Sequence, residues 1–123
     1  KFCDTSTFGS SVRFYSPKVV FQMMKHLREK YGVRHIMFVD DLFVASRLRV
    51  TELCQLLIES GLNFTWSCTS RVDTITPDTL ALMKKAGCWE ISFGLETGSN
   101  ALLKKMDKAA EVELINDPKE RAR

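Results

Sequence analysis

The sequence predicts an α/β fold in which the strands of a parallel sheet alternate with helices. Three short apolar or β-rich runs are separated by longer segments in which apolar residues recur at helical spacing. A glycine precedes each run, at Gly32, Gly61 and Gly87, so a helix–glycine–strand unit recurs at intervals of 29 and 26 residues. Units of this length imply right-handed crossovers, and therefore parallel strands covered by helices on at least one face.

The predicted strands are residues 35–40, 64–69 and 89–95. Before each strand, apolar residues recur at helical spacing: Val19, Val20, Met23, Met24 and Leu27; then Val50, Leu53, Cys54 and Leu57; then Thr79, Leu80, Met83 and Ala86. Ser16-Pro17 and Thr76-Pro77 each place a capping hydroxyl before a proline that fits the first helical turn. We expect three amphipathic helices, with Met23 and Met24 filling the core.

Composition favours one folded domain. The chain has 123 residues, of which 45% are hydrophobic and 27% charged, and its net charge of +3 gives no support for nucleic-acid binding. No run of 18 apolar residues and no export signal is present, so we expect a cytoplasmic protein without membrane contact. The four cysteines are expected to be reduced thiols, with Cys54 and Cys68 packed as small apolar residues.

Polar residues follow all three predicted strands. Parallel sheets bind ligands beyond the carboxyl ends of their strands, so these residues form the candidate site. We call them the rim: Asp40, Asp41, Ser70, Arg71, Asp73, Glu96, Thr97 and Ser99.

The chain also shows signs of being one piece of a larger domain. A three-stranded parallel sheet is small and leaves open edges, through which self-association is expected. Residues 108–123 are charged, weakly periodic and interrupted by Pro118, so we expect a frayed or disordered tail after a core that ends near residue 107.

Several segments, in their order along the chain, resemble the radical S-adenosylmethionine superfamily. They are Cys3-Asp4-Thr5, Val39-Asp40-Asp41, Ser70-Arg71-Val72-Asp73 and Phe93-Gly94-Leu95-Glu96-Thr97-Gly98. The resemblance covers residues 1–107 and is greatest to the branch whose members often have a cobalamin-binding domain upstream. It implies a partial (β/α) barrel of three to four strand–helix units, and cobalamin as an additional cofactor option.

The resemblance also implies a cofactor. Phe2 and Cys3 match the end of the family's loop for a four-iron, four-sulfur cluster, which makes Cys3 a metal ligand. The two other cluster cysteines would precede Lys1, so we expect the isolated chain to be inactive. Three thiolates leave one iron open for the amino and carboxylate groups of S-adenosylmethionine. The resemblance implies that one electron from an external reductant cleaves S-adenosylmethionine to a 5'-deoxyadenosyl radical, used for hydrogen abstraction, methylation or rearrangement. The substrate is not indicated.

The remaining roles are implied by position. Asp40 and Asp41 match the segment that meets the methionine ammonium group, and Arg71, with Ser70 beside it, would bind the methionine carboxylate. Glu96 would accept hydrogen bonds from the ribose. Each has a structural alternative: the aspartates as turn caps, Arg71 as the partner of Asp73, and Glu96 as a helix cap.

Two other functions remain open from the sequence. A signalling receiver would use Asp40 or Asp41 to accept a phosphoryl group with Mg²⁺, although the further acidic pair and lysine that it needs are not evident. A non-catalytic α/β scaffold would dock on a partner through an open sheet edge.

Overall fold

The computed structural model describes residues 13–40, 42–94 and 97–105, with side chains described up to Leu102. The chain divides into two compact units, one of which is Phe14–Phe93. The other contains Arg13 and the residues from Gly94 onward, including helix α4 (Asn100–Lys105). The predicted tail at 108–123 lies outside the described residues.

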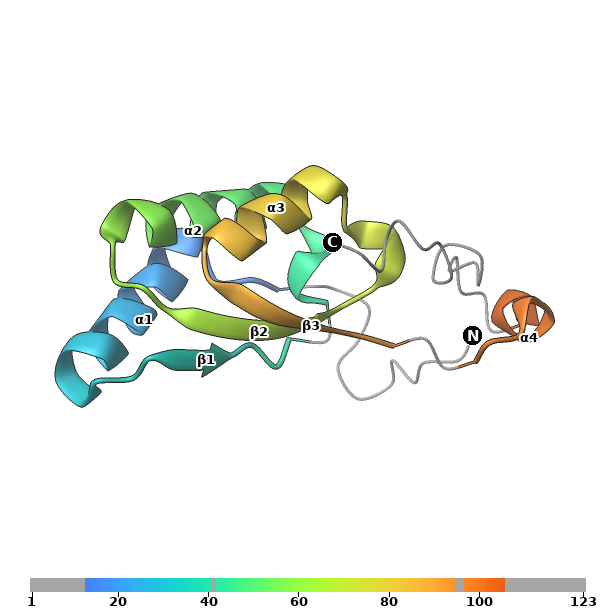
Figure 1. Ribbon diagram of the computed structural model, residues 1–123, viewed down its shortest axis with the longest axis horizontal. Coiled ribbons are helices and arrows are strands. Elements are labelled where there is room, and N and C mark those ends of the chain that lie inside the picture. Colours follow the sequence, from blue (N-terminus) through green and yellow to red (C-terminus); the bar gives the residue numbers. More distant parts are fainter. Residues whose placement is uncertain (1–12, 41, 95–96, 106–123) are drawn as a thin grey trace. The chain divides into compact units, whose positions relative to one another are not determined.

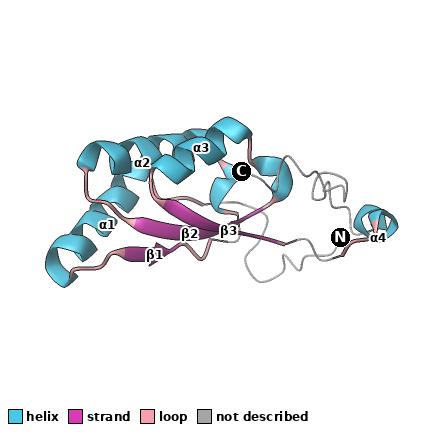
Figure 2. Cartoon of the chain, in the orientation of Figure 1, coloured by secondary structure: helices cyan, strands magenta, loops and turns pink. Residues whose placement is uncertain are grey.

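The Phe14–Phe93 unit is built on a parallel sheet. Its strands are β1 (His35–Met37), β2 (Thr65–Ser70) and β3 (Cys88–Phe93), in the order β1-β2-β3 (Figures 1 and 2). All pairings are parallel, which confirms the predicted α/β class with strand–helix units. The three strands start within one residue of their predicted positions, and β1 stops earlier, at Met37.

Three helices alternate with these strands, as predicted. They are α1 (Pro17–Tyr31), α2 (Arg47–Ser60) and α3 (Pro77–Lys85), and α2 lies beside α3 above the sheet in Figure 1. The Ser16 and Thr76 hydroxyls accept hydrogen bonds from the backbone N–H groups of Val19 and Thr79, which confirms both caps. Short 3₁₀ helices follow β1 (η1, Phe43–Ala45) and β2 (η2, Val72–Thr74).

The core lies between the helices and one face of the sheet. Trp66 of β2 is fully buried, and its ring lies 5.5 Å from Phe43 and 5.6 Å from Phe38, measured between centroids. Its indole Nε1 donates to the Ala86 carbonyl at 2.9 Å, so the largest core side chain leaves no polar atom unpaired. Met24 is buried as predicted, but the prediction for Met23 is wrong, since that side chain is 55% exposed.

The connection from α3 to β3 requires a glycine. Gly87 has φ +93°, and a Cβ at this position would lie 2.0 Å from the Phe64 carbonyl oxygen. Its own carbonyl accepts a hydrogen bond from the backbone N–H of Trp66 at 3.0 Å. The close approach therefore sets where β3 begins to pair with β2.

Candidate functional site

The carboxyl ends of β1 and β2 hold three of the predicted site residues. Asp40 is exposed beyond β1, Ser70 is the last residue of β2 and is buried, and Arg71 follows it on the exposed side. At these two strand ends the described part of the rim thus combines two carboxylates, those of Asp40 and Asp73, with one guanidinium. Four other predicted site residues lie outside the described residues: Phe2, Cys3, Asp41 and Glu96.

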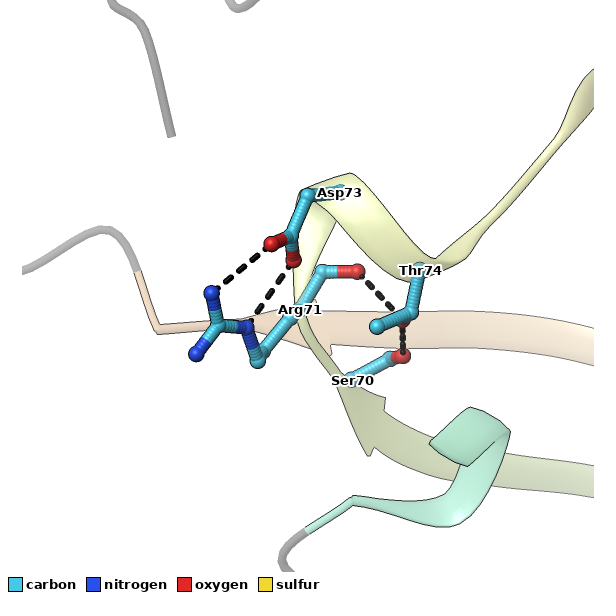
Figure 3. Close-up of polar contacts among 4 residues, drawn as sticks. All are labelled: Ser70, Arg71, Asp73 and Thr74. Atoms are coloured by element: carbon cyan, nitrogen blue, oxygen red, sulfur yellow. Dashed lines mark hydrogen bonds and ion pairs between the residues drawn. The ribbon is translucent and has the colours of Figure 1, made fainter. Parts of the chain in front are cut away.

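Arg71 forms a forked ion pair with Asp73 (Figure 3). Its Nε donates to Oδ1 at 2.9 Å and its NH2 nitrogen donates to Oδ2 at 2.7 Å. These hydrogen bonds from Arg71 hold the pKa of the Asp73 carboxyl below its usual range. The sequence left this pairing open as an alternative, and the structure shows that the fork suited to a ligand carboxylate already holds an internal one.

The loop after β2 is fixed by hydroxyl groups. The Ser70 and Thr74 side-chain oxygens are 3.0 Å apart, and the Thr74 hydroxyl also lies 2.8 Å from the Arg71 carbonyl oxygen (Figure 3). The Thr74 backbone N–H donates to the same carbonyl at 3.2 Å. Arg71 and Asp73 are therefore presented by a hydrogen-bonded 3₁₀ turn rather than by a loose loop.

The sheet face opposite the helices is largely polar, with Met37 as an exposed apolar member, and this face was not predicted. We call it the open face, and its residues follow from strand alternation and pairing: His35, Met37, Thr65, Ser67, Thr69, Glu90 and Ser92. All except Ser67 are exposed, and they form cross-strand rows such as Met37–Ser67–Glu90. The His35 Nδ1 lies 3.1 Å from the Thr65 hydroxyl, and Trp89 packs edge-on to the His35 ring.

The polarity of the open face limits what can cover it. Parallel strands buried between two helix layers are almost continuously apolar, whereas in β2 the polar Thr65, Ser67 and Thr69 alternate with Trp66 and Cys68. A second helix layer on hydroxyl and carboxylate groups would leave them without water. The open face suits the wall of a hydrated or ligand-binding cavity. The two-residue alternation in β2 was the sequence signal that could have revealed it.

The described thiols do not form a metal site. Cys54, Cys68 and Cys88 are free, buried in the core and contributed by α2, β2 and β3. Burial raises the pKa of Cys54 to about 12, and a hydrogen bond with Cys88, followed by burial, raises the pKa of Cys68. In the described ranges no three His, Cys, Asp or Glu side chains are grouped to hold a metal ion. These three residues therefore do not fit an iron–sulfur cluster, and the burial of Cys54 and Cys68 agrees with the packing role predicted for those two.

No helix among the described residues is long and apolar enough to span a bilayer.

Comparison with known proteins supplies an independent finding. Residues 1–115 match the family described as the radical SAM superfamily. The chain is 32% identical to an uncharacterised methyltransferase of Pyrococcus horikoshii over 87% of its own length and 24% of the relative. It is 28% identical to an anaerobic magnesium-protoporphyrin IX monomethyl ester cyclase of Rubrivivax gelatinosus, covering 91% of this chain and 20% of the cyclase.

A third relative is a cytidylyl-2-hydroxyethylphosphonate methyltransferase of Streptomyces wedmorensis, 27% identical over 87% of this chain and 20% of the relative. The chain thus spans about a quarter or less of the length of these curated proteins.

Proposed function

This chain belongs to the radical SAM superfamily, and from that premise we propose that it forms part of the catalytic barrel of an enzyme that reductively cleaves S-adenosylmethionine. The observation that supports this is the open face, because a polar wall on a parallel sheet with helices on its other side is what a ligand-filled barrel requires. The names of the relatives favour methyl transfer or ring closure as the outcome. In this proposal residues 1–107 form the barrel segment and 108–123 a charged tail.

The proposed cofactor is a four-iron, four-sulfur cluster held by Cys3 together with cysteines other than the three core thiols. Bound there, the cluster would deliver one electron from an external reductant to the sulfonium of S-adenosylmethionine. Cobalamin would be an additional cofactor, as in the branch that the sequence resembles. Free thiols throughout the described core suit a reducing compartment, and we place the protein in the cytoplasm.

The chain's own residues would bind the cosubstrate at the rim. Asp40, exposed beyond β1, provides a carboxylate for the methionine ammonium group, with Asp41 beside it in sequence. Arg71 would exchange Asp73 for the methionine carboxylate, with Ser70 next to it. An exposed ion pair is worth about 0 to 1 kcal/mol, so a ligand carboxylate that makes the same two charge-assisted hydrogen bonds needs only a small gain in affinity from its other groups to replace Asp73. Glu96 would accept hydrogen bonds from the ribose.

The test is anaerobic reconstitution of the protein that carries this segment, with iron and sulfide, followed by reduction and quantification of 5'-deoxyadenosine by mass spectrometry. We expect the product from the native protein, and neither product nor cluster absorption from Cys3→Ala. The matched control is Cys54→Ala, which removes a core thiol and should retain the cluster. A native protein that binds no iron and releases no 5'-deoxyadenosine would refute the proposal.

The ribose role has its own measurement. Alanine at Glu96 should weaken S-adenosylmethionine binding in isothermal titration calorimetry, since a charged hydrogen-bond acceptor is lost. An unchanged dissociation constant would remove Glu96 from the site while leaving the reductive chemistry intact.

The two other functions have less support. A receiver module buries both faces of its sheet under helices, and the hydroxyl and carboxylate side chains of the open face do not suit a second layer. A docking scaffold would use the outer edges of β1 and β3, which pair with no other strand among the described residues. Light scattering of the isolated chain would detect association through those edges.

A further inference from the structure

Helix α1 exposes a row of apolar side chains that the core does not use. Val20 and Met24 of this helix face the core and are buried. Val19, Met23 and Leu27 are instead 44%, 55% and 36% exposed. These three residues are four apart in the sequence, so they form one continuous row along the helix surface. Single exposed apolar residues are common, but a contiguous row of large ones marks a surface for contact.

A second row lies beside the apolar one and completes a groove. Lys18, Gln22 and His26 are also four apart, and each directly precedes a member of the apolar row. One helix packs on another by inserting a ridge of side chains four residues apart between two such rows. The two rows together line a hollow of about 520 Å³, which we call the α1 groove: Lys18, Val19, Gln22, Met23, His26 and Leu27.

The charge of the α1 groove is positive. Lys18 lies at one end of it, and Lys30 follows Leu27 by three residues, on the same side of the helix. The only carboxylate in the sequence of α1 is that of Glu29, which pairs with Lys25 at 3.7 Å. An apolar row bordered by lysines is complementary to a surface that carries an apolar row bordered by carboxylates.

We propose that the α1 groove docks an α-helix with apolar residues four apart beside a row of carboxylates. A second copy of α1 is disfavoured because the pairing would bring lysines together. A membrane surface is disfavoured because the apolar row has only three residues and lacks the aromatic side chains typical of interfacial helices. The docked helix lies outside residues 1–123, and the chain spans a quarter or less of its curated relatives. This docking does not depend on the proposed reaction.

The experiment uses the full chain labelled with carbon-13 at its methionine methyl groups. The probes are two synthetic peptides of about 18 residues, long enough to form a helix, with leucines four apart. One peptide carries glutamates in the row beside the leucines, and the other carries lysines there. The glutamate peptide should shift the NMR signal of the Met23 methyl group, and the lysine peptide should not. The Met37 methyl group, 68% exposed on the open face, is the control within the same chain and should not respond.

Paired variants test the apolar row and the charge separately, through the fluorescence anisotropy of the dye-labelled glutamate peptide. Met23→Gln should weaken binding by about tenfold or more, whereas Leu48→Gln, at an exposed apolar residue of α2, should leave it unchanged. Lys18→Glu should weaken binding by about two- to fivefold, whereas Lys84→Glu, at an exposed lysine of α3, should have no effect.

The other occupants would be recognised with the same labelled chain, which needs no variant. A Met23 signal that moves with neither peptide, or equally with both, would overturn the proposal. A Met23 signal that moves on dilution without peptide would assign the groove to a second copy of the chain. One that moves only with phosphatidylglycerol vesicles would assign it to a membrane surface, and either result would also overturn the proposal.

Discussion

Replacing Gly87 with alanine should destabilise the Phe14–Phe93 unit far more than the same change at the other left-handed glycines. The new Cβ would lie 2.0 Å from the Phe64 carbonyl oxygen, where real contacts essentially never fall below 3.0 Å, so backbone must move against backbone. We assign about 1 to 2 kcal/mol to the positive φ and about 1 to 3 kcal/mol to overpacking. Weakening of the hydrogen bond from Trp66 to the Gly87 carbonyl adds about 1 kcal/mol.

The controls separate these contributions. Gly32 and Gly61 have φ +70° and +62°, yet a Cβ at either position meets no atom within 4 Å. Gly32→Ala and Gly61→Ala should therefore cost only the backbone part, about 1 to 2 kcal/mol each. The assay is urea unfolding followed by the fluorescence of Trp66 and Trp89. Equal losses at all three glycines would refute this explanation, because they would show that the Phe64 contact does not constrain the fold.

Three further outcomes follow from polar and buried groups. Because Arg71 lowers the pKa of Asp73, the pair stabilises the fold above the ordinary aspartate pKa of about 3.9 and less as pH falls through the lowered value. The native chain should be more stable than Asp73→Asn by less than about 1 kcal/mol, and this difference in the free energy of unfolding should vanish in acid. A difference that grows on acidification would contradict this. Burial raises the pKa of Cys54 to about 12, so only about one part in ten thousand of this thiol is ionised at pH 8. Iodoacetamide should therefore modify Cys54 only after unfolding, as measured by peptide mass spectrometry. Trp66→Phe removes the indole N–H that donates to the buried Ala86 carbonyl. The free energy of unfolding, measured by calorimetry, should fall by about 1 to 3 kcal/mol. An unchanged value would mean that water replaces the indole as donor.

The regular elements were predictable because helical spacing agreed with a capping or glycine signal at most of their boundaries. Ser16 and Thr76 cap their helices, and Gly32 and Gly61 end theirs in the left-handed conformation. Helical spacing could not show which side of a broad apolar stripe meets the sheet. Met24 therefore lies in the core while its neighbour Met23 is exposed.

The candidate site was predictable in position more than in contacts. The sequence located Asp40, Ser70 and Arg71 at strand ends, since connectivity alone determines those ends. Whether Arg71 binds Asp73 depends on side-chain rotamers within a 3₁₀ turn, which spacing does not encode.

The ion pair of Arg71 with Asp73 also limits which anions can bind the Arg71 guanidinium, because each of them has to displace Asp73. Asp73 is tethered two residues from the guanidinium, so its effective concentration there is of millimolar order or above. A free monocarboxylate at lower concentration competes poorly with this internal anion. A molecule displaces Asp73 only if its other groups bind elsewhere on the protein and add affinity. Asp73 would therefore exclude simple anions from the Arg71 guanidinium and admit a larger ligand that binds at several points.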